Sequence, residues 1–205
     1  MGNSYWNSML IRYGLLLVLG LGNLFIFYLI FTPLTIYPVL DLISQFYDAV
    51  LLRSNPTQTC DLASNLFPSL KNIACMNTTI FFKGYFASII PACIAGAAYY
   101  LLLILNLSTP MSKKQRAKSI FFLMSSFLFL NILRIFSFAL LYVNKGFELF
   151  NIAHVATWYF GSTILVIFIW FINVFLLNIK SIPIYSDFKF IMNQIKGKKW
   201  VSFQV

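Results

Sequence analysis

Residues 89–98 are I-I-P-A-C-I-A-G-A-A, and they open an apolar segment that continues to residue 107. Cys93 lies in the first turn of this segment, among alanines and a glycine. Small residues let two membrane helices approach closely, so a cysteine beside them is usually a packing residue. A chemical role for Cys93 therefore depends on where the segment lies in the chain and on which other polar residues share its depth.

The composition is that of an integral membrane protein. Of the 205 residues, 60% are hydrophobic and only 10% are charged, and the mean hydropathy is +0.82. Soluble domains carry about 25% charged residues, and a helix needs about 20 apolar residues to cross a bilayer. The sequence predicts an all-α integral membrane protein. It has a single membrane domain over residues 1–205 and four transmembrane helices, at residues 9–31, 89–107, 119–143 and 152–179.

Residues 32–88 are expected outside the cytoplasm, as an amphipathic helix followed by a polar loop. The helix is predicted at residues 35–52, where Asp41 and Asp48 are seven positions apart and share one helical face. Apolar residues occupy the opposite face, and this pattern favours a helix that lies in the membrane interface. An alternative is that residues 35–52 form a fifth transmembrane helix.

The positive charge lies in segments that the positive-inside rule assigns to the cytoplasm. The net charge is +10. The loop at residues 108–118 carries four basic residues and no acidic one, and the tail at residues 180–205 is also basic. The segments assigned outside, residues 32–88 and 144–151, hold four basic and four acidic residues. The N-terminus and the tail are therefore predicted to be cytoplasmic, and the charge needs no nucleic-acid partner.

Cys60 and Cys75 fall in the outer loop, which faces an oxidising compartment. They are expected either to form a disulfide or to remain two free thiols. The chain has one histidine, no Cys-x-x-Cys pair and no phosphate-binding loop. We therefore expect neither a metal site nor a cofactor.

Arg134 and His154 are two further polar residues in apolar segments. With a rise of about 1.5 Å per residue, Cys93, Arg134 and His154 lie about 6, 12 and 4 Å from the outer ends of their spans, and an arginine side chain reaches outward by several Å. Singly, each has a structural explanation: packing, contact with lipid headgroups, or an interfacial position. Together they suit thiolate chemistry, because an imidazole accepts the thiol proton and a guanidinium stabilises a thiolate or a tetrahedral oxyanion.

Two polar residues accompany Arg134 on its helix. Asn131 lies one turn before it and Ser137 one turn after it. Residues three apart on a helix lie on the same face, so both are expected to orient the guanidinium.

Three short motifs follow one another in the chain. They are Ala92-Cys93-Ile94-Ala95-Gly96 at the outer start of one span, Asn131-Ile132-Leu133-Arg134-Ile135 late in the next, and His154 at the start of the last. In this order they resemble the exosortase/archaeosortase family, over residues 35–179. The resemblance implies a membrane cysteine transpeptidase in which Cys93 is the nucleophile, Arg134 stabilises charge and His154 is the general base or acid. Gly96 would be the glycine of the cysteine motif.

The resemblance also implies substrates, an acceptor and a location. The substrates would be secreted proteins with a C-terminal signal made of a short motif, a transmembrane helix and a basic tail. Cleavage near the motif would transfer the new carboxyl end to an acceptor, a membrane lipid in the archaeal members. The protein would be a multi-pass protein of a prokaryotic plasma membrane with its active site facing outside. An alternative is a non-catalytic scaffold or envelope-assembly subunit, in which Cys93 is only a packing residue.

Overall fold

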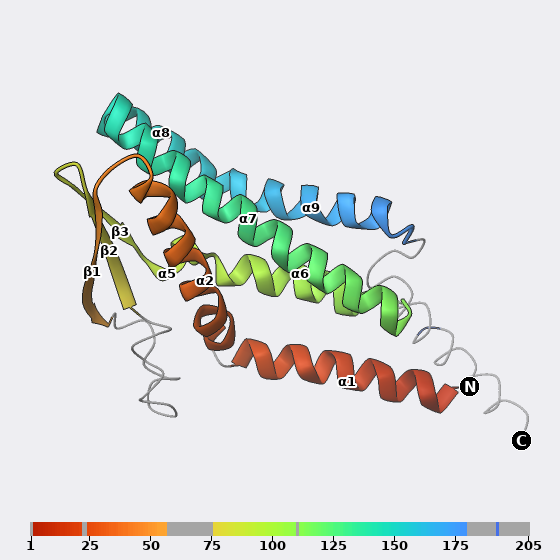
Figure 1. Cartoon of the computed structure of the whole chain (residues 1–205). Coiled ribbons are helices and arrows are strands. Elements are labelled where there is room, and N and C mark those ends of the chain that lie inside the picture. Colours follow the sequence, from red (N-terminus) through yellow and green to blue (C-terminus); the bar gives the residue numbers. More distant parts are fainter. Residues whose placement is uncertain (1, 22–23, 57–75, 110, 180–191, 193–205) are drawn as a thin grey trace, which may run out of the picture.

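The computed structural model describes residues 2–21, 24–56, 76–109, 111–179 and 192. These residues form mostly helices, with one small sheet (Figure 1). In chain order the elements are α1 (Gly2–Leu21), α2 (Phe25–Ser44), β1 (Ala49–Pro56), β2 (Met76–Phe82), β3 (Tyr85–Ile89), α5 (Pro91–Ile94), α6 (Gly96–Ser108), α7 (Lys113–Lys145), α8 (Phe147–Ala156), the π-helical turn η2 (Thr157–Gly161) and α9 (Ser162–Leu176).

The chain is a mostly helical integral membrane protein, as its composition predicts. Within the described residues, four helical stretches are long and apolar enough to cross a membrane: Phe25–Ser44, Pro91–Ser108, Lys113–Lys145 and Phe147–Leu176. The last three correspond to the three later spans predicted from the sequence. Large apolar side chains such as Phe121 and Phe175 remain exposed on the helices, as expected of a surface that contacts lipid.

The predicted first span, residues 9–31, is wrong in its bounds. α1 ends at Leu21, and α2 begins at Phe25. Leu24, which precedes α2, has a φ of 60°. A residue in the left-handed conformation does not continue a right-handed helix, so residues 9–31 do not form one span.

The predicted amphipathic helix at residues 35–52 is also wrong. α2 continues through Pro33 and Pro38 to Ser44, and strand β1 follows from Ala49. Proline is tolerated inside a membrane helix when neighbouring groups satisfy the freed backbone. α2 is itself apolar enough to span a membrane, but it is one of the four such stretches among the described residues. It therefore replaces the predicted first span and is not the fifth transmembrane helix of the alternative.

Three antiparallel strands in the order β1-β2-β3 form a sheet that the sequence did not predict. Lys83 and Gly84 make the two-residue turn between β2 and β3, with φ values of 49° and 81°. Positive φ at both positions is what a type I′ hairpin requires, and Phe82 pairs with Tyr85 across the turn. Ile80 and Phe82 are buried, and the sheet packs against α2.

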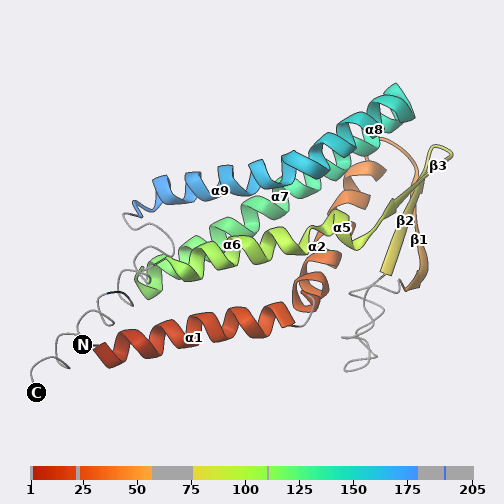
Figure 2. The same ribbon diagram turned by 180° about the vertical axis from the view of Figure 1, so that it is seen from behind.

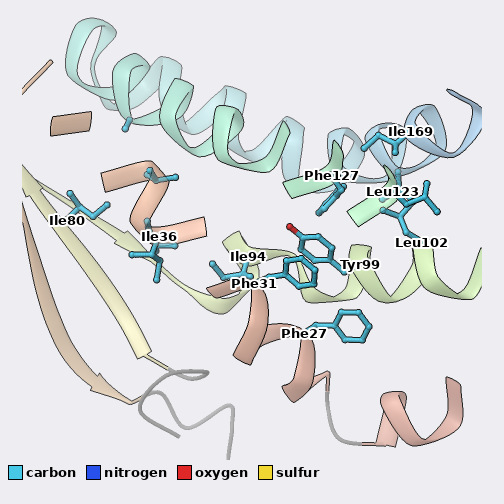
Figure 3. Close-up of a cluster of buried hydrophobic side chains, with 14 of the residues drawn as sticks. Phe27, Phe31, Ile36, Ile80, Ile94, Tyr99, Leu102, Leu123, Phe127 and Ile169 are labelled. Carbon is cyan, nitrogen blue, oxygen red and sulfur yellow. The ribbon is translucent and has the colours of Figure 1, made fainter. Parts of the chain in front are cut away.

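The long helices pack side by side, with the sheet at one end. α1, α6, α7 and α9 run alongside one another, and α2 crosses from the end of α1 towards the sheet (Figures 1 and 2). In the core, the ring of Tyr99 stacks on Phe31 with centroids 3.7 Å apart and meets Phe127 edge-on at 4.7 Å (Figure 3). Such aromatic pairs contribute about 0.5–1.5 kcal/mol each beyond the burial of their area. Leu102 and Leu123 extend this layer between α6 and α7.

Arg116 holds the turn between α6 and α7. Its guanidinium donates through Nη1 to the carbonyl oxygen of Asn106 at 2.7 Å and through Nη2 to that of Thr109 at 3.0 Å. The side chain of Asn106 donates to Ser119 Oγ at 2.6 Å. The last carbonyl groups of a helix lack partners within it, so Arg116 supplies donors at the end of α6.

Candidate cysteine-centred active site

A cavity of about 590 Å³ lies at the sheet end of the bundle, and Cys93, Arg134 and His154 all line it. The three residues come from α5, α7 and α8. Residues of α2, β2 and β3 complete the lining. The structure therefore brings together the three polar residues that were singled out by their depth in the membrane.

The backbone breaks at Ala95, two residues after Cys93. α5 is a single helical turn, and α6 starts again at Gly96. Ala95 between them has a φ of 60° and a ψ of 45°. A left-handed conformation costs a residue with a Cβ about 1–2 kcal/mol, and such strain is frequent at functional sites. The break also makes the carbonyl groups of α5 available to side chains.

Two side chains of α7 bind those carbonyl groups. Asn131 Nδ2 donates to the carbonyl oxygen of Cys93 at 3.1 Å and to that of Ile94 at 3.4 Å. Arg134 Nη2 donates to the same oxygen of Cys93 at 3.1 Å. Asn131 is fully buried. Its side chain thus holds the cysteine turn, which corrects the prediction that Asn131 orients Arg134.

Ser162 also belongs to the candidate site, and the sequence did not predict it. Arg134 Nη1 donates to Ser162 Oγ at 2.9 Å, and Ser162 also lines the cavity. It directly follows η2, and π-helical turns are frequent at functional sites. Ser137, which was predicted to orient Arg134, is exposed and does not line the cavity, so that prediction is wrong. No spacing in the sequence connects Ser162 with Arg134, which lies on another helix.

Arg134 is the cationic group nearest to Cys93 in this lining, and the lining contains no acidic side chain. Its Nε is buried and has no partner within the described residues. A guanidinium in a site of low dielectric strongly favours a negative charge beside it. The cavity is thus suited to a thiolate or to the oxyanion of a tetrahedral intermediate.

His154 lies on α8 among aromatic rings. Its ring stacks on Phe150 with centroids 5.3 Å apart and meets Phe138 edge-on with centroids 5.6 Å apart. The ring of Trp158 lies at a tilt, with centroids 6.1 Å apart. Among the described residues, no hydrogen bond joins His154 to Cys93. The geometry puts the imidazole on the cavity wall, where it reaches a thiol only after a side-chain movement or through a bridging water.

Gly96 lets Tyr28 of α2 approach the cysteine turn. A Cβ at Gly96 would lie 2.8 Å from Cζ of Tyr28 and 3.2 Å from its hydroxyl oxygen. Both residues line the cavity. The glycine of the cysteine motif is therefore required for close packing of the Tyr28 ring.

Several predicted features lie outside the described residues. They include Cys60, Cys75 and nearly all of the tail at residues 180–205. Within the described residues, no group of three histidine, cysteine or acidic side chains is arranged to hold a metal ion. The candidate site thus consists of Cys93 and the groups around it.

Comparisons of the chain with protein-family models, with curated proteins and with solved structures find no match.

Proposed function

We propose that this protein is a membrane cysteine transpeptidase of the exosortase/archaeosortase type. Its substrates are secreted proteins that end in a short motif, a transmembrane helix and a basic tail. It cleaves them near the motif and passes the new carboxyl end to an acceptor, a membrane lipid. The observation that supports this best is the convergence of Cys93, Arg134 and His154 on one cavity from three different helices.

In the first half of the reaction, Cys93 Sγ attacks the carbonyl carbon of the scissile peptide bond. His154 accepts the thiol proton through a bridging water or after its side chain moves towards Cys93, and the carbonyl oxygen becomes an oxyanion that Arg134 stabilises. Collapse of the tetrahedral intermediate breaks the C–N bond. His154 then gives its proton to the leaving amine, and the substrate remains as a thioester on Cys93.

In the second half, the amine or hydroxyl group of the acceptor attacks the thioester carbonyl. His154 takes the proton of the attacking group, and Arg134 again stabilises the oxyanion. The C–S bond breaks, and the thiolate of Cys93 recovers the proton. The free enzyme is restored without a cofactor.

The active site faces the outside of the plasma membrane. Two observations support this orientation. The cavity is at the sheet end of the bundle, and the basic turn between α6 and α7 is at the opposite end (Figures 1 and 2). Basic turns remain on the cytoplasmic side of membrane proteins, so a cavity at the other end is open to secreted proteins.

Processing of a secreted protein that carries the tripartite tail tests this proposal. Cys93→Ala and Cys93→Ser should each lower the rate by about 10³-fold or more, since loss of a covalent nucleophile removes the whole pathway. Membrane yield and thermal unfolding in detergent should stay near those of the unchanged protein. Continued maturation of the substrate by the Cys93→Ala protein would rule the proposal out.

A non-catalytic scaffold is the second candidate, because Cys93 also packs against the apolar core cluster. A membrane-impermeant maleimide separates the two functions when it is applied to a protein with Cys60→Ser and Cys75→Ser. The transpeptidase requires labelling of Cys93 in the native protein. A scaffold predicts labelling only after denaturation.

A further inference from the structure

The cavity extends along strand β3 as well as around Cys93. Four consecutive residues of this strand line it: Phe86, Ala87, Ser88 and Ile89. Successive side chains of a strand point to opposite faces of the sheet. A cavity that touches four residues in a row therefore runs along the edge of β3 and is not confined to one face of the sheet.

That edge has unpaired backbone groups within the described part of the chain, where β3 pairs only with β2. Pairs in an antiparallel ladder alternate between hydrogen-bonded and non-hydrogen-bonded. The pair that closes a two-residue turn, here Phe82 and Tyr85, is a hydrogen-bonded one. By this alternation, Phe86 and Ser88 direct their N–H and C=O groups away from β2.

The edge is fixed in position at both of its ends. At the hairpin tip, the ring of Tyr85 meets Tyr142 of α7 edge-on, with centroids 5.2 Å apart. At the other end, Ile90 keeps an extended backbone with φ of −88° and ψ of 162°, and α5 with Cys93 follows directly. An extended chain beside β3 thus lies in the cavity that Cys93 also lines.

We propose that the free edge of β3 binds the substrate as an additional β-strand and so delivers the scissile bond to Cys93. The inference rests on the transpeptidase function proposed above. The occupant is an extended peptide, since attack on a peptide carbonyl requires the chain on one side of that carbonyl to occupy the cavity. Main-chain hydrogen bonds to Phe86 and Ser88 supply binding that is independent of sequence, and pockets beside the edge select alternate side chains.

Two electrophilic probes test the inference on the full chain in lipid nanodiscs. One is acetyl-tetraalanine with a C-terminal vinyl sulfone, and the other is acetyl-alanine with the same group. The thiol of Cys93 adds across the vinyl bond, sulfur forming a C–S bond and the proton moving to the neighbouring carbon. We expect the longer probe to label Cys93 at least about tenfold faster, measured by mass spectrometry of the Cys93 peptide.

The backbone contribution is measured by removing single N–H groups. N-methylation of alternate alanines in the longer probe should abolish its advantage, whereas methylation of the intervening alanines should not. In the protein, Ser88→Pro removes the outward N–H group and should also abolish the advantage. Ser88→Ala keeps this group and is the matched control. The advantage is the ratio of the two labelling rates in each variant, so a change in the cysteine turn that slows both probes alike does not alter it.

Three other outcomes would contradict either strand addition or the proposed function. If the short probe labels Cys93 but the longer one has no advantage, strand addition is wrong and the proposed function stands. If the advantage survives methylation of every alanine, the cavity binds apolar bulk, as it would a lipid chain, and strand addition is again wrong. If neither probe labels Cys93, the proposed function fails, and this inference fails with it.

Discussion

Arg134 is connected to Cys93 through the backbone, because its Nη2 donates to the carbonyl oxygen of Cys93 at 3.1 Å while its Nη1 donates to Ser162 Oγ at 2.9 Å. A planar guanidinium reaches two acceptors in fixed directions, which the ammonium group of a lysine does not. The arginine therefore joins α5, α7 and α9 around the cavity. Its shape matters as well as its charge.

Arg134→Lys keeps the positive charge but loses the planar guanidinium, which donates to two acceptors in fixed directions. We expect it to lower the rate of substrate processing by about 10²-fold or more, the size of effect seen when a donor to an oxyanion is lost. Arg134→Gln, which also removes the charge, should lower the rate further. A reporter protein with the tripartite tail provides the rate. Processing by Arg134→Lys at the unchanged rate would show that charge alone is sufficient.

Asn131→Ala should destabilise the protein by about 1–3 kcal/mol, because it leaves buried carbonyl groups of α5 without their donor. Thermal unfolding in detergent measures this change. Ser137→Ala is the matched control on the same helix, since Ser137 is exposed, and it should change stability by less than about 0.5 kcal/mol. Equal stability of the two variants would contradict a structural role for Asn131.

Ala95→Gly should stabilise the protein by up to about 1 kcal/mol, because glycine adopts a positive φ without the steric cost of a Cβ. Ala97→Gly, two residues further along and inside α6, should instead destabilise it by about 0.5–1 kcal/mol, the usual cost of glycine in a helix. Opposite signs in thermal unfolding would show that the left-handed break exists in the membrane protein. Destabilisation by both substitutions would mean that α5 and α6 are one continuous helix.

Gly96→Ala should destabilise the protein by about 1–3 kcal/mol, because the added methyl group overlaps the ring of Tyr28. The same substitution in a Tyr28→Ala background should cost much less, since the space is then open. A double-mutant cycle in thermal unfolding gives the coupling between the two positions. A coupling near zero would contradict the close approach of α2 to the cysteine turn.

The sequence predicts the later helices and the shared end of the bundle for the three polar residues well, because both follow from where each apolar segment begins and ends. Hydrophobic length defines a span without reference to other elements. Counting residues from the ends of the spans was enough to put Cys93, Arg134 and His154 at similar depth, and they line one cavity.

The parts that the sequence did not predict depend on contacts between distant residues. The sheet forms only when β1 pairs with β2, which is separated from it by residues 57–75. The spacing of apolar residues within 35–52 contains no information about that pairing. The break at Ala95 is stabilised by Asn131, which donates to Cys93 and Ile94 from another helix. Ser162 likewise acquires its role only when α9 packs against α7.

Arg116 has two roles, because it is a basic residue of the α6–α7 turn and also donates two hydrogen bonds to the end of α6. In the orientation proposed above, the basic turn that contains it lies on the cytoplasmic side, where positive charge favours retention during insertion, and as a helix cap it holds α6 to α7 afterwards. A change that neutralises Arg116 in order to invert the topology would also loosen the finished bundle. Lys113, Lys114 and Lys118 are therefore the better positions for altering insertion, since changes there would test orientation without removing the cap.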